Sequence, residues 1–390
     1  IQAIHPDVAI IHVQQADMYG NCIHHGSVVT DRLMAMAARM VIVTCDELVG
    51  PEFIRKNPDK TSINGFFVDY VIPVQYGSHP TSSHGLHSYD PQEIKNYLKA
   101  SINYEEYQEF VYNRISIPEI EYIEKFVNPE NFGHTLEIIE KGDYTISELI
   151  ACVLAREVKN GELGICGAVS EIPMAALQLA ERTEAPDMKW IAGGSGYVSP
   201  RGLLVPSSTD FAMAYKAEGK LSMNEVIPIE MQNIDFFFAG GLQIDKRGNT
   251  NLAGIPSEDG WKLRGPGSVG LPFLSRAGRV YLYTLTHNKR TLVDKVSYIS
   301  GPGHIGEKNL RSKGPTLMVT NLCVFRWDYE LDNWRLYTIH PRVTLDEIIE
   351  NTGFEFDYDK DVPFTEIPTA KELGILREID PIGYLRGSRD

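Results

Sequence analysis

The residues of this chain that could take part in chemistry include loop glycines and glutamines at strand ends. Glycines are concentrated in residues 192–200, AGGSGYVSP, and in residues 265–270, GPGSVG. Glycine lets a backbone N–H approach a carbonyl or anionic oxygen closely, although a plain surface turn explains residues 265–270 equally well. The candidate ligand-binding residues are Gly193, Ser195, Gly196, Gly241, Gln243, Gly265, Gly267, Ser268, Gly270 and Gln15.

The GPGSVG segment fits the G-x-G-x-x-G pattern of dinucleotide-binding proteins. That pattern binds a dinucleotide only where a strand ends directly before it and a helix opens directly after it. Here EDGWKLR precedes the glycines, and LPFLSRAG, with an early proline, follows them. A nicotinamide site is therefore not expected. Ser195 also lacks the G-x-S-x-G context of a hydrolase nucleophile.

Three histidines, His79, His84 and His87, lie within nine residues of one another. Such a cluster is typical of a metal site. However, Pro80 and Gly85 place it in a loop, and no carboxylate pattern supports zinc. We therefore expect this loop to line a site or an interface, and we expect no metal.

A motif of the form Q-x-D-x-x-G-N occurs twice, at residues 15–21 and 243–249, each time after an apolar run. Its aspartate, Asp17 or Asp245, would be a general base if the motif were catalytic. The alternative is stronger, because D-x-x-G-N is good turn chemistry after a strand. The glutamine at the strand end is better placed to face a ligand.

The match between the two copies continues on both sides of this motif. Asp7 and Asp235 lie ten residues before the aspartate of each motif. The segment ARMVIV (38–43) parallels GRVYLY (278–283), FVDYV (67–71) parallels LVDKV (292–296), and His79 and His304 each lie eight residues past the closing valine. Four features in the same order predict two copies of one α/β unit, with the break near residues 127–144.

The two copies differ in completeness. Roughly ninety residues separate the first helix of the second copy, near Thr145, from Asp235, whereas six residues precede Asp7. The first copy therefore lacks its opening strands and helices. We expect another polypeptide, or a removed N-terminal segment, to complete it.

Short runs rich in Val, Ile and Phe alternate with helical patterns along the chain. The expected strands cover residues 8–13, 40–44, 66–74, 162–166, 189–193, 234–240 and 280–285, and the expected helices cover 31–39, 145–161 and 171–184. Strands that are apolar on both faces are typical of a mainly parallel sheet with helices on both sides. Residues 317–339 predict a C-terminal β-hairpin that turns at Asp332 and Asn333.

Bulk properties exclude several functional classes. The net charge of −15 argues against a nucleic-acid partner, and no apolar run is long enough to span a membrane. No signal peptide is visible, so a cytoplasmic protein is expected. The five cysteines are scattered, which predicts reduced thiols. Cys45 or Cys166 could be a nucleophile, but buried inert thiols are commoner.

Together these motifs resemble the family I coenzyme A transferases of the glutaconate CoA-transferase type. PDVAIIHVQQADMYGN, VIVTCDELV and FFVDYVIPVQYGSHPTSSHG are similar to the C-terminal part of an α subunit, which assigns residues 1–130 to that unit. EIPMAALQLAERTEAPD, FFFAGGLQIDKRGNTN, RGPGSVG and HNKRTLVDKVSYISGPG are similar to a β subunit, which assigns residues 145–357 to it and leaves 358–390 as a tail. The resemblance implies two homologous, open, mainly parallel α/β units of the NagB/RpiA-like type.

The resemblance also implies an acyl-CoA substrate, an oligomer, and no cofactor other than coenzyme A within the substrate. The family's transferases use a β-subunit Glu as nucleophile, and Gly194 stands at that position here. One branch without this Glu is a heterodimeric hydrolase that opens a ring of a diketone acyl-CoA. In a hydrolase, His304, His79 or the missing segment would activate water. A non-catalytic CoA-binding subunit is the third alternative.

Overall fold

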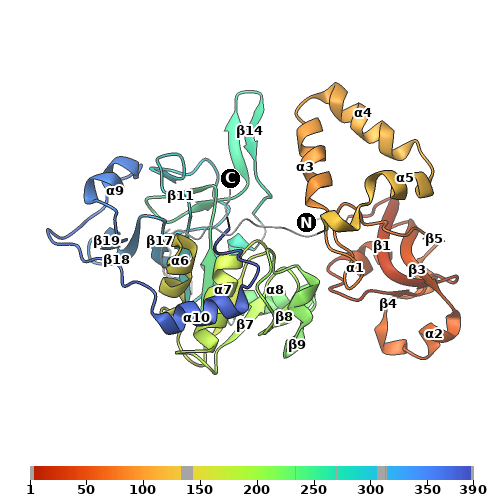
Figure 1. The fold of residues 1–390 in the computed structure, drawn as a ribbon, viewed down its shortest axis with the longest axis horizontal. Helices are drawn as coiled ribbons and strands as arrows, with labels where there is room; N and C mark the ends of the chain where they lie inside the picture. Colours follow the sequence, from red (N-terminus) through yellow and green to blue (C-terminus); the bar gives the residue numbers. More distant parts are fainter. Residues whose placement is uncertain are drawn as a thin grey trace. The chain divides into compact units, whose positions relative to one another are not determined.

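The chain forms two compact units, Ile1–Thr135 and Leu136–Asp390, which we describe separately (Figure 1). The structure is a computed structural model. It describes residues 4–132, 144–232, 234–268, 270–304, 312 and 314–387. Both units contain mainly parallel sheets flanked by helices, so the predicted α/β class is confirmed.

The first unit is built on a five-stranded sheet with the order β4-β2-β1-β3-β5. The long strands β1 (Val8–Asp17) and β3 (Met40–Val49) and the shorter β5 (Tyr70–Pro73) are parallel. Two short antiparallel strands, β2 (Cys22–Ile23) and β4 (Thr61–Ile63), continue the sheet beyond β1. The helix α1 (Asp31–Ala37) packs on one face through Ala35. A short helix, α2 (Pro51–Arg55), follows β3.

Three helices that the sequence did not predict follow the sheet of the first unit. They are α3 (Pro91–Ala100), α4 (Tyr104–Ile115) and α5 (Glu119–Phe126). Asp90 caps α3 by accepting hydrogen bonds from the N–H groups of Gln92 and Glu93. The guanidinium of Arg114 on α4 pairs with Glu93 on α3 and stacks over the Phe126 ring on α5. One arginine therefore holds the three helices together.

The second unit is built on a nine-stranded sheet with the order β19-β18-β17-β15-β10-β6-β7-β8-β9. The strands β6, β7, β10, β15 and β17 are parallel, and both ends of the sheet are antiparallel. The predicted C-terminal hairpin is formed by β18 and β19, and Asp332 adopts a positive φ of 52° in its turn. The strands are β6 (Leu163–Cys166), β7 (Lys189–Ala192), β8 (Tyr197–Val198), β9 (Gly219–Lys220), β10 (Phe236–Ala239), β15 (Arg279–Tyr283), β17 (Pro315–Val319), β18 (Cys323–Asp328) and β19 (Asn333–Ile339).

Both faces of this sheet are covered, so its strands are apolar on both sides. On one face α6 (Ile146–Ala155), α7 (Glu171–Glu181) and α10 (Ala370–Ile379) enclose a core with Phe236, Phe238 and Tyr281. On the other face α8 (Met223–Gln232) and α9 (Leu345–Asn351) enclose a second core with Phe237 and Val280. The C-terminal tail thus joins the core of this unit through α10.

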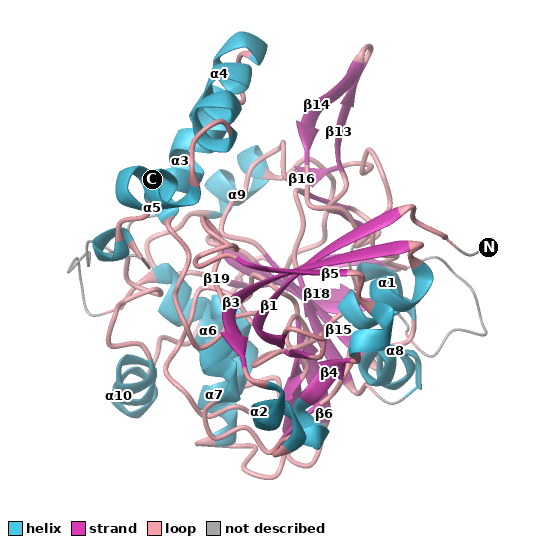
Figure 2. Cartoon of the chain, turned by 90° about the vertical axis from the view of Figure 1, so that its right-hand side faces the viewer, coloured by secondary structure: helices cyan, strands magenta, loops and turns pink. Residues whose placement is uncertain are grey.

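A smaller sheet and an arm extend from the second unit. The sheet has the order β12-β11-β16 and is formed by β11 (Gln243–Asp245), β12 (Thr250–Asn251) and β16 (Leu292–Val293). The arm is the antiparallel pair β13 (Gly254–Ser257) and β14 (Gly260–Arg264). Figure 2 shows this arm extending away from the strands of its unit.

The two Q-x-D-x-x-G-N motifs fold into the same turn. In the first, the Asp17 carboxylate accepts hydrogen bonds from the backbone N–H groups of Tyr19 and Asn21 and from the Asn21 side chain, at 2.9–3.0 Å. In the second, the Asp245 carboxylate accepts the same three bonds from Arg247 and Asn249, at 2.9–3.2 Å. The glycine of each motif has a positive φ, 85° at Gly20 and 73° at Gly248.

The equivalence extends to the segments that these turns hold. The Asn21 side-chain oxygen accepts a hydrogen bond from the Gly65 N–H at 2.9 Å, and that of Asn249 accepts one from the Gly303 N–H at 2.8 Å. The Ser62 hydroxyl accepts from the His24 N–H at 3.2 Å, just as the Ser300 hydroxyl accepts from Leu252 at 2.9 Å. These matched bonds identify both units as copies of one fold.

Two of the sequence matches between the copies are wrong. Leu292 and Val293 pair with Ile244 and Asp245, as Leu48 and Val49 pair with Ala16 and Asp17. LVDKV therefore corresponds to residues 48–52 and not to FVDYV. Since Gly303 corresponds to Gly65, the residue equivalent to His304 is Phe66, and His79 has a different place in the fold. A short V-D-x-V pattern could not reveal this, because the single strand β3 is divided into β15 and β16 in the second copy.

The two copies differ most in what pairs with the strand before each motif, which is β1 in the first unit and β10 in the second. In the second unit β6 pairs with β10, and the Asp235 carboxylate accepts the Leu163 N–H at 2.9 Å. In the first unit, among the described residues, no strand pairs with residues 8–14 of β1 on the side away from β3. Val8 and Ile10, the counterparts of buried Phe236 and Phe238, are 47% and 68% exposed.

We expect the Asp17→Ala substitution to lower the free energy of unfolding of the first unit by about 3 kcal/mol, because it leaves three donors of the turn without their charged acceptor. Asp245→Ala should act in the same way on the second unit. Urea unfolding measures the effect, and Asp7→Ala is the matched control, since the Asp7 side chain is 85% exposed. Equal stabilities of the Asp17 and Asp7 variants would contradict the structural role of the turn.

Candidate functional site

The carboxyl ends of the central strands in the second unit carry the glycine-rich loops. The strands β6, β7 and β10 end at Cys166, Ala192 and Ala239, and each is followed directly by glycine. Ligands of open α/β sheets bind outside these strand ends. The structure therefore brings residues 193–196 and Gly241 to the edge where a ligand is expected.

The backbone of residues 193–196 forms a tight internal turn. The Gly193 N–H donates to the Cys166 carbonyl at 3.0 Å, and the N–H groups of Ser195 and Gly196 both donate to the Ala192 carbonyl. Gly196 has a φ of 77°, and a Cβ there would lie 2.1 Å from the Leu221 carbonyl oxygen. Glycine is thus required at this position by both conformation and space.

Gly194 is held by a serine from a neighbouring loop. Its N–H donates to the Ser208 hydroxyl at 3.1 Å, and that hydroxyl donates to the Gly167 carbonyl at 2.8 Å. A Cβ at Gly194 would lie 2.4 Å from the Thr209 methyl carbon and 2.9 Å from the Ser208 hydroxyl oxygen. Residues 208 and 209 therefore occupy the space that a side chain at Gly194 would need.

Ser195 carries a buried hydroxyl that has no hydrogen-bond partner among the described residues. The residue is 4% exposed. An unsatisfied buried hydroxyl costs free energy, and a ligand oxygen that reached it would remove that cost. Among residues 193–196, Ser195 is the one with an uncommitted donor.

The second glycine loop, residues 265–270, lies against the strand-end turn of the small sheet. The Gly265 N–H donates to the Ala253 carbonyl at 3.0 Å, and the Gly267 N–H donates to the Leu252 carbonyl at 3.3 Å. Gly267 has a φ of 102°, which favours glycine. After Ser268, Gly270 precedes the short 3-10 helix Leu271–Ser275. Among the described residues 270–304, no α-helix opens after these glycines, so the dinucleotide-binding context is absent from this part of the chain.

The two motif glutamines have different surroundings. The Gln243 side chain is 7% exposed, and its oxygen accepts hydrogen bonds from Asn251 at 2.8 Å and from the Ser297 N–H at 3.0 Å. Gln15 lies nearer the surface, where its amide group donates to Glu47 at 2.6 Å and its oxygen lies 3.1 Å from His25 Nε2. Gln15 is therefore the more accessible of the pair.

The two histidines expected to act as bases are both buried. The His79 ring bonds the Tyr122 hydroxyl at 2.8 Å and the Asp90 carboxylate at 3.4 Å, and burial lowers its pKa. The His304 ring stacks on Trp327, with centroids 3.6 Å apart, and its Nε2 donates to the Pro315 carbonyl at 2.8 Å. Both rings thus connect elements of the fold, and their role in catalysis stays a prediction.

The sequence analysis did not predict a polar cluster that joins the interior of β1 and β3 to the loop after β5. The Asp46 carboxylate accepts hydrogen bonds from the Ser83 hydroxyl at 2.7 Å and the Tyr76 N–H at 3.0 Å, and it lies 3.0 Å from His12 Nε2. Burial acts to raise the pKa of Asp46, but the bonds from His12 and Ser83 hold it below its ordinary value. The signal that could have revealed this cluster is the position of His12 and Asp46 on neighbouring strands.

Three further observations concern the thiols, metal-binding groups and membrane-spanning helices of the described residues. The five cysteines are free and buried, and burial raises the pKa of Cys166 to about 12, which opposes a thiolate nucleophile. Among the described residues, no group of three or more His, Cys, Asp or Glu side chains could hold a metal ion. No helix in the described part of the chain is long and apolar enough to cross a membrane.

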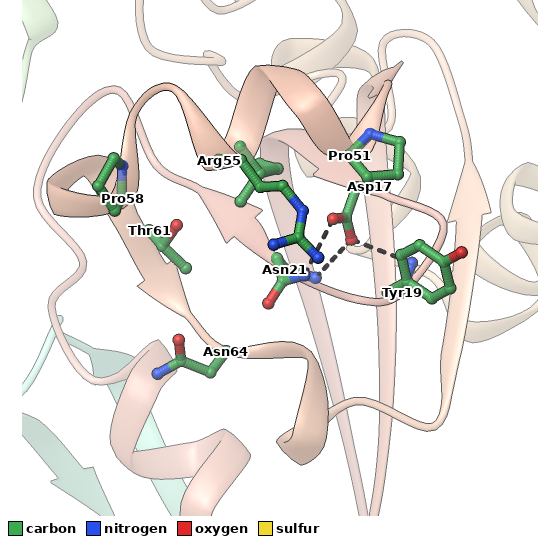
Figure 3. Close-up of a pocket in the computed structure, with 9 residues that line it drawn as sticks. Asp17, Tyr19, Asn21, Pro51, Arg55, Pro58, Thr61 and Asn64 are labelled. Carbon is green, nitrogen blue, oxygen red and sulfur yellow. Dashed lines mark hydrogen bonds between the residues drawn. The ribbon is translucent and has the colours of Figure 1, made fainter.

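An open cavity of about 520 Å³ lies beside the turn of the first unit (Figure 3). Asp17, Tyr19, Asn21, Arg55 and Asn64 are among the residues that line it. The figure shows the Arg55 side chain reaching toward Asp17 and Asn21, whose polar atoms are joined within the turn. The cavity thus presents one cationic group beside side chains that already serve the fold.

Comparison with known protein families decides the assignment of the chain. Residues 1–73 and 148–351 match the family model described as coenzyme A transferase. The chain belongs to the coenzyme A transferase family. It is therefore an enzyme of this family, and both of its units contribute to the match.

The relatives of this coenzyme A transferase family member include components of heteromeric enzymes. It is 31% identical over 247 residues to the B subunit of 3-oxoadipate CoA-transferase of Pseudomonas knackmussii, which covers 61% of this chain and 94% of that one. It is 42% identical over 104 residues to the A subunit of glutaconate CoA-transferase of Acidaminococcus fermentans, which covers 27% of this chain and 32% of that one. It is 27% identical to the IpdB subunit of the cholesterol ring-cleaving hydrolase of Rhodococcus jostii over 57% of this chain and 86% of that one.

A solved structure supports the same assignment. The crystal structure of the decarboxylase AibA/AibB matches with a TM-score of 0.56 and 26% identity, and the match covers 62% of this chain and 98% of that one. The coenzyme A transferase fold therefore carries transferases, a ring-cleaving hydrolase and a decarboxylase among the proteins similar to this chain. Family membership alone does not choose between these reactions.

The buried carboxyl of Glu230 predicts a pH dependence of stability in this family member. Glu230 is 7% exposed, and burial raises its pKa to about 7. As pH rises above the ordinary Glu pKa of about 4.3, the Glu230 carboxyl ionises in the unfolded chain but stays protonated in the folded one. The contribution of Glu230 to the free energy of unfolding is therefore fully present below that pH and is lost progressively up to about pH 7. Glu230→Gln should be more stable than the parent by roughly 2–3 kcal/mol at pH 8 and equally stable at pH 4.

Urea unfolding at the two pH values measures this effect, with Glu184→Gln in the same unit as the matched control. Glu184 is exposed to solvent, so its substitution should leave the pH profile unchanged. If Glu230→Gln and the parent lost stability in parallel from pH 4 to pH 8, the buried carboxyl would not be its cause.

Proposed function

We propose that this enzyme processes an acyl-CoA thioester without a glutamate nucleophile, by hydrolysis of a C–C or thioester bond. The observation that carries this proposal is the packing at Gly194, the residue that the sequence resemblance places at the position of the family's catalytic Glu. A glycine there has no carboxylate to form an acyl anhydride or an enzyme–CoA thioester. The nearby Ser208 and Thr209 occupy the place of a side chain, so the loop is shaped around the glycine.

Water replaces the carboxylate as the attacking group in this proposal. The acyl carbonyl then needs a donor for its developing oxyanion, and the water needs a base. The Ser195 hydroxyl is the uncommitted donor beside Gly194. His304, His79 and a segment completing the first unit remain the bases proposed from the sequence, although both rings have structural partners in this chain. The likeness to one component of a ring-cleaving hydrolase supports hydrolysis.

The test is an acceptor experiment with the full chain together with any polypeptide that co-purifies with it. Acetyl-CoA, a 3-oxoacyl-CoA and a cyclic diketone acyl-CoA are each incubated with and without acetate or succinate, and products are followed by mass spectrometry. We expect a hydrolysed or ring-opened product without acceptor. Transfer of CoA to the acceptor would overturn the proposal, and saturable CoA binding without turnover would favour a non-catalytic CoA-binding subunit.

Gly194→Glu is the sharpest variant for the same question. Because Ser208 and Thr209 fill the space, the added side chain should displace them, and we expect no gain of acceptor-dependent transfer and a loss of the parent activity of at least tenfold. Gly219→Ala is the matched control, since a Cβ at Gly219 meets nothing within 4 Å. Efficient transfer by the Gly194→Glu variant would show that the site is a transferase site lacking only its nucleophile.

We also propose that a strand followed by a helix, supplied by another polypeptide segment, completes the first unit. The free edge of β1 and the exposed Val8 and Ile10 support this, because their counterparts in the second unit lie beneath α6 and α7. Asp7 supports it too. It is the counterpart of Asp235, which accepts the first N–H of β6. The oligomer, in this view, contains a segment like the opening part of an α subunit in addition to this chain.

Hydrogen exchange tests the completing segment. The N–H groups of β1 that point away from β3 should exchange rapidly in the isolated chain and should be protected at least a hundredfold when the segment is bound. Ile10→Lys should abolish association measured by light scattering, whereas Ile102→Lys, at a residue 86% exposed, should leave it intact. Equal association of both variants would place the partner elsewhere.

A further inference from the structure

The open cavity beside the Asp17 turn is lined by residues of the first unit (Figure 3). We propose that this cavity binds a free organic carboxylate, whose charged group pairs with Arg55 and whose hydrocarbon part lies on an apolar wall. The inference goes beyond the proposed hydrolysis and is independent of it. Its site lies entirely within residues 17–64.

The cavity lies where ligands of parallel sheets are expected. Asp17 is the last residue of β1, and Pro51 comes two residues after Val49, the last residue of β3. The two strands are parallel, and Asp17 and Val49 are partners in their pairing. Ligands of open α/β sheets bind outside the carboxyl ends of such strands. The cavity is therefore at the edge of the first unit that suits a ligand.

The cavity is formed by a segment that the second copy of the fold lacks. Twelve residues (50–61) separate β3 from Ser62, whereas six residues (294–299) separate β16 from the equivalent Ser300. The added length forms α2 and the short 3-10 helix Pro58–Lys60. This segment supplies four of the lining residues, which are Pro51, Ile54, Arg55 and Pro58. Because the second copy folds without such a segment, a ligand explains it better than the needs of the fold do.

One part of the lining is apolar. It consists of Tyr19, Pro51, Ile54 and Pro58. Ile54 is 7% exposed, whereas Tyr19 is 64% exposed and would be covered by a bound ligand. Covering apolar surface with a hydrocarbon group is favourable. The cavity volume of about 520 Å³ also falls within the range of small-molecule pockets, which is about 300–1,000 Å³.

The other part of the lining carries polar groups with unused hydrogen-bonding capacity. Among the described residues, the side chains of Thr61 and Asn64 form no hydrogen bond. Arg55 has an ionic contact with Glu52 at 3.8 Å, which is too long for a hydrogen bond. The two side chains of this pair are 76% and 81% exposed, so the pair contributes little. The Arg55 guanidinium is therefore available to a better placed anion.

The Asp17 carboxylate in the wall does not take the place of that anion. Its oxygens accept three hydrogen bonds from the Tyr19 and Asn21 N–H groups and the Asn21 side chain, and the residue is 1% exposed. Figure 3 shows Arg55 reaching toward this turn, but no ion pair joins it to Asp17. Arg55 is therefore the charged group that an incoming anion would meet.

The second unit shows what an arginine beside this turn binds. Arg247 corresponds to Tyr19, and its guanidinium donates to both oxygens of the Asp332 carboxylate, at 2.8 and 3.2 Å. Asp332 lies in the turn of the hairpin β18–β19. Among the described residues of the first unit, no such hairpin follows β5 in the sheet. A guanidinium and a carboxylate form a strong bidentate pair, so a carboxylate is the group that we expect in the cavity.

Calorimetric titration of the full chain with hexanoate tests the site, and hexanamide is the uncharged control of the same shape. Hexanoate should bind at one site and about tenfold or more tightly than hexanamide, because only the carboxylate pairs with Arg55. Acetate should bind about tenfold or more weakly than hexanoate, because it lacks four methylene groups. No binding of hexanoate at millimolar concentration, equal binding of hexanamide, or tighter binding of inorganic phosphate would overturn the proposal.

Two variants of one ion pair should change the affinity for hexanoate in opposite directions. Arg55→Ala should weaken binding about tenfold or more, whereas Glu52→Gln should strengthen it about two- to fivefold by removing a competing carboxylate. Arg32→Ala is the matched control, since Arg32 is an exposed residue of the same unit, and it should bind like the parent. A parent-like affinity of Arg55→Ala, or weaker binding by Glu52→Gln, would overturn the proposal. These titrations use no acyl-CoA, so their outcome is separate from that of the proposed function.

Discussion

The buried carboxylate of a strand-end turn is the interaction on which both units depend. Asp17 and Asp245 each collect three hydrogen bonds within their own turn, and the asparagine of that turn reaches across to the Gly65 or Gly303 backbone. The turn therefore fixes the direction of the strand that precedes it and the position of the loop that returns to it. Every candidate group near the turn, from Gln15 to the glycine loop, takes its place from this geometry.

The same turn is used with different surroundings, and the difference follows from how each sheet is covered. A parallel sheet needs apolar cover on both faces. In the second unit α6 and α7 supply it, so Phe236 and Phe238 are buried. In the first unit the equivalent strand exposes Val8 and Ile10, while α1 covers the opposite face. The first residues of β1 are apolar on both faces, as in a strand that is covered on both sides, although Val8 and Ile10 are exposed here.

Much of the fold could be predicted, because the evidence for it is local. Apolar runs of five to seven residues predicted β1, β3, β6, β7 and β10, and a Thr cap predicted the start of α6. The helices α3–α5 were missed, since the Arg114 contacts that hold them are between helices and leave little trace in any one segment. The V-D-x-V match failed because strand register depends on which strands pair and not on a short sequence pattern.

For the candidate site, the glycine loops could be predicted from composition. The packing of Thr209 on Gly194, the burial of His79 and the Glu47–Gln15–His25 chain could not, since each joins residues distant in sequence.

In the proposed hydrolysis, the groups around Gly194 limit how an oxyanion could be stabilised. The N–H groups of residues 193–196 are all committed to protein acceptors, so the loop has no free backbone donor for an oxyanion. The adjacent Ser195 hydroxyl is buried without a partner among the described residues, and such a group is destabilising until something accepts from it. A carbonyl oxygen would satisfy it, and more strongly as negative charge grows on that oxygen. Binding energy at Ser195 would therefore increase from the bound substrate to the transition state, which is the condition for catalysis rather than for binding alone.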